Sequence, residues 1–459
     1  MTAWLEKHFD LKGNGTTVRT ELLAGCTTFL TMSYIIFVQP AVLSGKMFGF
    51  ESGMDFGAVM TATCLGAAVA SAIMGLHARY PIAQAPGMGQ NFFFMLSAVP
   101  AATAAGFENG WQTALGVVFL SGLLFLALSL FQVRETLLNA ISPGMKHAIA
   151  SGIGLFIAFI GLQNAGLILK SPATGVTLNA KILSPDLIVF FVGLLVAGGL
   201  QARRRPAAIL FGILAASLVT AGFKFWRPES VARFEFAESV VAVPPSIAPT
   251  LFQFDLGNAL SLAMLPFVLV FLFMVLFDTV GTLVGVAGQA GMLQDNHLPR
   301  ARQAFTADAL GTTIGACLGT STVTAYIESA TGVQQGGRTG LTSVTVAGLF
   351  LLALFFSPII AMIGGYPPLT APALVIVGVM MFGGVRAIDW RDFTEALPAF
   401  AVIAGIPFCY SIGDGLALGF LCHPLIKLLA GRRREVHWFM YPLAGLIVLY
   451  FVFVRARIG

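Results

Sequence analysis

The chain has 459 residues, of which 57% are hydrophobic and only 10% are charged, and its net charge is +5. Soluble domains carry about 25% charged residues, so this composition excludes an ordinary soluble protein and fits a chain surrounded by lipid. The Lys and Arg residues are dispersed between apolar stretches, so they indicate membrane topology and not nucleic-acid binding.

The N-terminal residues lack the apolar core of a secretory signal peptide, and residues 4–11 are expected to lie on the membrane surface. Beyond them, a bilayer core about 30 Å thick requires about 20 apolar helical residues for each span. Apolar stretches near this length predict twelve spans, near residues 20–40, 57–77, 113–132, 147–168, 185–201, 206–224, 259–288, 303–318, 341–362, 370–385, 393–410 and 412–430.

Two further apolar stretches, 87–98 and 327–335, are too short to cross alone. Each follows a run that looks extended, residues 81–86 in one case and 320–324 in the other. Counting them as the third and tenth segments gives two similar halves of seven segments. Because seven is odd, the second half must enter the membrane inverted, an arrangement typical of secondary transporters.

The distribution of positive charge agrees with fourteen segments. With a cytoplasmic N-terminus, about 18 of the 26 Lys and Arg residues fall on the cytoplasmic side. They include clusters at residues 203–205, 299–302 and 432–434. The apolar stretch 437–454 is expected to be either a fifteenth span or a helix along the inner surface.

Two carboxylates lie deep in these apolar segments. Asp278 is about halfway along the span at 259–288, where a charge costs about 2.5–3.5 kcal/mol, so it must face a cavity or a partner. Glu328 opens the second short helix, where the helix dipole favours a negative charge. We interpret both as binding and proton-coupling residues. The alternatives are a helix cap for Glu328 and an internal hydrogen-bond partner for Asp278.

The first short helix contains polar and aromatic side chains next to glycines. Gln90 and Asn91 supply amide donors and acceptors, and Phe92 supplies a flat apolar surface, which together suit a planar, hydrogen-bonding ring. Thr28, Thr282 and Thr324 are candidates for the same cavity, although threonine often bonds only to its own helix backbone.

No enzyme motif is present. The sequence has no phosphate-binding Gly-x-x-x-x-Gly-Lys-Ser/Thr loop, no Gly-x-Ser-x-Gly and no His-Glu-x-x-His. We therefore expect a transporter driven by an ion gradient, with no cofactor and no metal site.

Several long blocks resemble the nucleobase–cation symporter-2 superfamily, in its adenine/guanine/hypoxanthine permease branch. The resemblance covers nearly the whole chain, in order. The blocks are Asn14–Glu21, Thr27–Pro40, Ala85–Asn91, Leu276–Gly285, Gly319–Ser329 and Gly336–Gly340.

The resemblance implies fourteen transmembrane segments in two inverted repeats of seven, divided into a core and a gate domain. It implies import of adenine, hypoxanthine or guanine with protons by alternating access, in the plasma membrane and in many members as a dimer. Asn91, Asp278 and Glu328 fall on motif positions that matter for binding and coupling. The domains would be core at 1–138 and 257–364, gate at 139–225 and 365–431, an extracellular connection at 226–256, and a C-terminal helix and tail at 432–459.

Some positions depart from the family pattern. Gln90 and Phe92 replace an expected Leu and Ala, Gln39 replaces a common Asn, and Val275 stands where many members carry a second acid. These changes leave the preferred purine and the coupling ion, proton or sodium, open. The rival functions are an anion or other small-solute transporter of the same architecture and, from a different class, a channel.

Overall fold

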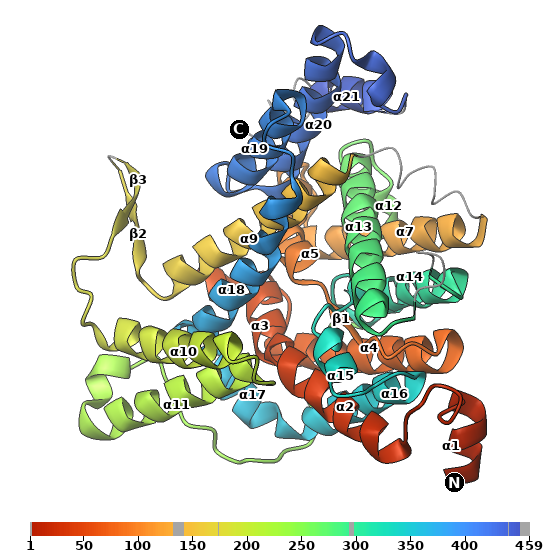
Figure 1. The fold of residues 1–459 in the computed structure, drawn as a ribbon. Coiled ribbons are helices and arrows are strands. Elements are labelled where there is room, and N and C mark those ends of the chain that lie inside the picture. Colours follow the sequence, from red (N-terminus) through yellow and green to blue (C-terminus); the bar gives the residue numbers. More distant parts are fainter. Residues whose placement is uncertain (1, 132–141, 173, 293–297, 439, 450–459) are drawn as a thin grey trace.

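The computed structural model describes residues 2–131, 142–172, 174–292, 298–438 and 440–449. Almost all of its regular structure is helical (Figure 1). Within the described residues, ten helical stretches are long and apolar enough to cross a membrane. The predicted class, an α-helical polytopic membrane protein, is confirmed at this level.

Helices occupy each span predicted in the first half of the chain. In chain order the elements are α1 (Thr2–Phe9), α2 (Val18–Met32), α3 (Tyr34–Leu43), α4 (Phe56–Ile73), β1 (Gln84–Pro86), α5 (Met88–Phe93), α6 (Val99–Ala104), α7 (Gly110–Phe131), α9 (Pro143–Asn164), β2 (Ile168–Ser171), β3 (Gly175–Leu178), α10 (Pro185–Ala202) and α11 (Ala208–Trp226). The hairpin of β2 and β3 after α9 was not predicted.

The second half repeats this pattern of long and short elements. Its elements are α12 (Leu256–Ala259), α13 (Leu265–Gln289), α14 (Ala301–Leu318), β4 (Val323–Ala325), α15 (Ser329–Gln334), α16 (Gly340–Ala353), α17 (Ser357–Gly364), α18 (Pro367–Phe382), α19 (Phe393–Phe408), α20 (Ile412–Leu429) and α21 (Met440–Leu449). α21 covers part of the stretch predicted at 437–454. Residues 450–454 of that stretch lie outside the described residues.

The two short broken segments meet. β1 and β4 pair antiparallel, with Gln84 opposite Ala325 and Pro86 opposite Val323. Their extended shape has local causes, because Pro86 disfavours a helical conformation for the residue before it and β-branched residues favour strands around Val323. Each strand leads directly into a short helix, α5 or α15. The extended runs and the second short helix, α15, were predicted, and the structure confirms them. The first short helix, predicted at 87–98, is longer: α5 continues through a π-helical turn at Phe94–Ala98 into α6, which ends at Ala104.

Several predicted boundaries differ from the structure, and the span predicted at 259–288, for example, is α13 from Leu265 to Gln289. Two other differences have a clear local cause. α9 begins at Pro143, four residues earlier than predicted, where the Ser142 hydroxyl accepts a hydrogen bond from the Met145 amide. The predicted span 341–362 is divided into α16 and α17 by a 3-10 turn at Leu354–Phe356. Pro358, near the start of α17, has no amide hydrogen for a continuous helix, which explains the break.

The helices pack in two groups (Figure 1). In one group, α9 packs against α18 and α19, and α10 packs against α11 and α18. In the other, α4 and α7 pack against α14, and α2 and α4 pack against α16. The α9–α18 contact is backbone to backbone, because a Cβ atom at Gly378 would lie 2.4 Å from the Gly154 carbonyl oxygen.

Candidate substrate-binding site

A cavity of about 370 Å³ lies where the two groups of helices face each other. This volume is within the usual range of small-molecule sites, about 300–1,000 Å³. One wall comes from α9 and α18, and the opposite wall comes from α5, α13 and the residues that join β4 to α15. Most of the lining is apolar, with a few polar groups that converge on it.

Glu328 lines the cavity at the start of α15 and is only 5% exposed. Its carboxylate accepts a hydrogen bond of 2.8 Å from the Tyr34 hydroxyl on α3. The side chain makes no capping bond to its own helix. A cap was the alternative reading of this residue, and the carboxylate instead faces the cavity and Tyr34.

Asp278 lines the same cavity from the middle of α13. The Gln90 amide on α5 donates a hydrogen bond of 3.1 Å to its carboxylate. This contact fixes the first short helix to α13. The lone pairs of the Asp278 carboxylate that Gln90 does not use can accept hydrogen bonds from donors in the cavity.

Four of the candidate residues line the cavity: Gln90, Asp278, Thr282 and Glu328. The other four, Thr28, Asn91, Phe92 and Thr324, are buried behind its wall. Thr28 lies on α2 and its hydroxyl faces α15, where a Cβ atom on Gly332 would meet it at 2.2 Å. The Asn91 amide oxygen accepts a hydrogen bond from the Ser321 hydroxyl beside β4.

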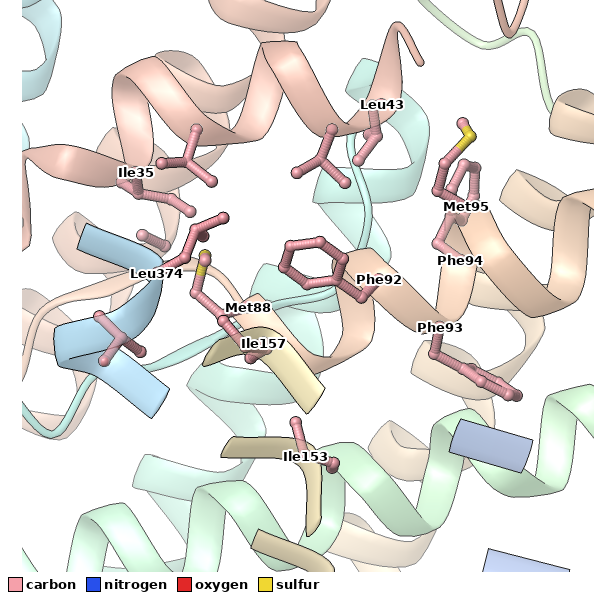
Figure 2. Close-up of a cluster of buried hydrophobic side chains, with 14 of the residues drawn as sticks. Ile35, Leu43, Met88, Phe92, Phe93, Phe94, Met95, Ile153, Ile157 and Leu374 are labelled. Atoms are coloured by element: carbon pink, nitrogen blue, oxygen red, sulfur yellow. The ribbon is translucent and has the colours of Figure 1, made fainter. Parts of the chain in front are cut away.

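Phe92 lies in an apolar cluster with Met88, Ile157 and Leu374 (Figure 2). Its ring also meets Phe48 edge to face, with 5.9 Å between the ring centroids. Phe92 therefore packs α5 against its neighbours.

Asp308 is a fully buried carboxylate that was not among the predicted residues. It accepts hydrogen bonds of 2.7 Å from both the Gln84 amide of β1 and the Ala325 backbone amide of β4. The hydroxyl groups of Thr279 and Thr324 bond to the same carboxylate. Asp308 thus connects β1 and β4 to Thr279 of α13, the residue that follows Asp278. Its signal was present in the sequence, since it lies in the middle of the predicted span 303–318.

The cavity also contains side chains that the sequence did not indicate. Tyr34 and Tyr326 line it, and the Tyr326 hydroxyl donates to the Pro86 carbonyl oxygen at 2.6 Å, again joining the two broken segments. Lys146 and His147 line it from α9. Among the described residues, no group of three or more His, Cys, Asp or Glu side chains could hold a metal ion.

The sequence pattern of the Permease family matches residues 19–414. The chain belongs to this family. The resemblance to the nucleobase–cation symporter-2 superfamily, in its adenine/guanine/hypoxanthine permease branch, is confirmed, and the protein is a membrane transporter, not an enzyme.

The sequences of similar proteins align with nearly the full length of this permease. It is 43% identical to a guanine/hypoxanthine permease of Bacillus subtilis over 98% of the chain and 100% of that relative. It is 39% identical to an adenine permease of Escherichia coli over 99% of the chain and 97% of that relative.

The fold of this permease also resembles the transmembrane domain of a cyanobacterial bicarbonate transporter. The TM-score is 0.61, the similarity covers 86% of this chain and 97% of that domain, and the sequence identity is 17%. At this identity the likeness concerns the fold alone.

Proposed function

We propose that this permease imports purine nucleobases together with protons. The observation that carries the proposal is the pair of carboxylates, Asp278 and Glu328, in one apolar cavity beside two broken helices. Purine bases have ring N–H donors, for which carboxylates are strong acceptors. Phe277 and Tyr326 add flat surfaces to the same cavity, which suit an aromatic ring.

The names of the relatives support adenine, hypoxanthine and guanine as the substrates. Asp278 and Glu328 are the proposed proton-coupling groups, because each can bind a proton or the substrate. Asn91, Phe92, Thr28 and Thr324 would support the site from behind, and Gln90 and Thr282 would contact the substrate. Sodium is the alternative coupling ion.

For the architecture, we propose fourteen segments in two inverted repeats of seven, with α21 as an additional C-terminal helix. The core domain would be 1–138 and 257–364, and the gate domain 139–225 and 365–431. The packing of α9 with α18 and α19, and of α4 with α14 and α16, supports this division. Transport would proceed by movement of the core against the gate, in a protein that assembles as a homodimer.

The proposed orientation has a cytoplasmic N-terminus in the plasma membrane, with basic clusters at 203–205, 299–302 and 432–434 in the cytoplasm. α9 then begins on the cytoplasmic side. The cavity extends to Pro143, the first residue of α9. With this orientation, the cavity reaches the cytoplasmic end of α9.

The test is uptake of radiolabelled adenine, hypoxanthine, guanine, xanthine and uracil into proteoliposomes, with and without an inward proton gradient. Glu328→Gln is the inactive control, because an amide no longer provides a charged acceptor. We expect saturable, gradient-stimulated uptake of purines that is lost in the variant. Uptake at normal affinity by Glu328→Gln would overturn the assignment of the site.

Parallel measurements separate the rival functions. A sodium gradient replaces the proton gradient in one set of vesicles, and bicarbonate replaces the nucleobases in another. Uptake of bicarbonate without uptake of any base would favour the anion transporter, and uptake that does not saturate would favour the channel.

A further inference from the structure

Among the described residues that line the cavity there is one lysine, Lys146, and it enters from α9, a different helix from the segments that carry the two carboxylates. Lys146 is the fourth residue of α9, and its ammonium nitrogen is 5.8 Å from the centroid of the Phe277 ring. Phe277 directly precedes Asp278 on α13. The Lys146 ammonium therefore reaches from α9 across the cavity to the wall that carries Asp278.

The ion pairs found within the described residues join His423, Lys427 and Arg432 to carboxylates, and none of them involves Lys146. An ammonium group has three donors and no acceptor. A ligand that displaces water from such a group must supply an acceptor, because otherwise the desolvated charge carries a large cost. The cavity thus favours a ligand with donors for the carboxylates and an acceptor for Lys146.

We propose that Lys146 binds the 6-oxo oxygen of a 6-oxopurine, such as hypoxanthine or guanine, while Asp278 and Glu328 accept hydrogen bonds from ring N–H groups. This inference rests on the proposed function. In the tautomer with a proton on N7, the 6-oxo oxygen lies between the N1–H and N7–H groups. That edge of the ring presents a donor, an acceptor and a second donor in a row. The two carboxylates can accept from the two N–H groups, and the ammonium can donate to the oxygen between them.

Adenine does not match this arrangement. It carries an amino group, a donor, at the position of the 6-oxo oxygen, so the amino group and the ammonium would oppose each other. Sites that hydrogen-bond a substrate group discriminate strongly against analogues that lack it. Lys146 would therefore determine a preference for 6-oxopurines.

The experiment measures equilibrium binding of hypoxanthine, adenine and unsubstituted purine, which has only hydrogen at C6, to the purified full-length protein. Wild-type protein should bind hypoxanthine more tightly than the other two compounds. Lys146→Met should weaken hypoxanthine binding about 10–100-fold, the usual effect of losing a charge-assisted hydrogen bond. Binding of unsubstituted purine should change less than about threefold, because it makes no bond that the variant removes.

Two further variants complete the design. Lys170→Met, which removes an exposed lysine on the β2–β3 hairpin, is the matched control and should leave all three affinities unchanged. Lys146→Arg should restore part of the preference. If Lys146→Met does not fold, the comparison of the three compounds on wild-type protein still tests the proposal.

The outcomes separate this inference from the proposed function. Wild-type protein that binds no base would contradict the proposed function itself. Wild-type protein that binds adenine best, or a Lys146→Met variant that keeps the ratio of hypoxanthine to purine affinity, would overturn the role of Lys146 and leave the proposed function intact.

Discussion

The carboxylates of this permease are each held by a side chain from another part of the chain. Tyr34 orients Glu328 from α3, and Gln90 orients Asp278 from α5. A carboxylate has about four lone-pair positions, so each acid keeps acceptors for a ligand after these contacts are made. The geometry therefore combines fixed acceptor positions with unused hydrogen-bonding capacity.

Asp278→Asn tests the coupling role at this scale. An amide cannot bind and release a proton, so we expect slower uptake and a flatter dependence of uptake on pH. The measurement is initial uptake rate in proteoliposomes between about pH 5 and 8, where perturbed carboxylates and histidines titrate. The same pH profile in variant and wild type would remove Asp278 from coupling.

Asp308→Ala tests the buried network beside the site. It would leave the Gln84 amide and the Ala325 backbone N–H without their acceptor, and each unsatisfied buried group costs about 1–3 kcal/mol. We expect a lower melting temperature in detergent, with a smaller loss for Asp308→Asn. A variant as stable as wild type would show that water replaces the carboxylate.

The sequence was sufficient to predict that Asp278 and Glu328 face a cavity, because a charge in an apolar segment has few explanations. Asp308 carried the same signal and was missed, although it lies at the middle of a predicted span. Lys146 could not be found in this way. The predicted span began at residue 147, so Lys146 counted as an ordinary charge at a helix end, and only the four-residue shift of α9 brings it into the cavity.

At the scale of elements, run length and composition predicted the long helices well. The length of the second short helix, α15, was also predicted, whereas the first continues past the predicted end at 98 to Ala104. The extended runs before them were indicated by Pro86 and by the β-branched residues before Ala325. The pairing of β1 with β4 had no local signal, because its partners are far apart in the sequence. Thr324 and Asn91 were placed in the cavity by proximity in sequence, whereas the structure turns them toward Asp308 and Ser321.

The α9–α18 crossing should tolerate no added side chain. In Gly378→Ala, the new Cβ atom would lie 2.4 Å from the Gly154 carbonyl oxygen, so the helices must move apart. We expect a loss of about 1–3 kcal/mol in stability. Gly348→Ala is the matched control, since a Cβ atom there meets nothing within 4 Å, and its melting temperature should stay near that of wild type. Equal melting temperatures for both variants would contradict the tight crossing.

At the scale of the whole molecule, the cavity lies between the two groups of helices, so alternating access requires their relative movement. Ile153 on α9 and Met274 on α13 approach each other there. A Cβ atom on Gly89 would lie 2.7 Å from one side chain and 3.8 Å from the other (Figure 2 shows Ile153). A covalent link between these two positions should stop the movement.

The prediction uses Ile153→Cys with Met274→Cys in a background without the five natural cysteines. A short bifunctional thiol reagent should abolish uptake, and reduction should restore it. Thr31→Cys with Thr331→Cys, between α2 and α15 within one group of helices, is the control, because the two native hydroxyl oxygen atoms lie 3.2 Å apart. Full uptake by the first cross-linked pair would exclude relative movement of α9 and α13 during transport.

The pairing of β1 with β4 also has a consequence for biogenesis. The Gly87 amide donates to the Thr322 carbonyl oxygen at 2.9 Å, and the Tyr326 amide donates to the Ala83 carbonyl oxygen at 3.0 Å. Unsatisfied backbone groups in lipid cost several kcal/mol each. Because the ribosome makes β1 long before β4, the first half must wait at the insertion machinery or with a chaperone until its partner strand arrives.

A protein divided within residues 226–256 would make this delay visible. Either half expressed alone should be degraded, and both halves expressed together should accumulate and restore uptake. A first half that persists alone, measured by pulse-chase labelling, would mean that its strand finds another partner. The β1–β4 pair therefore cannot form before most of the second half of this permease has been synthesised.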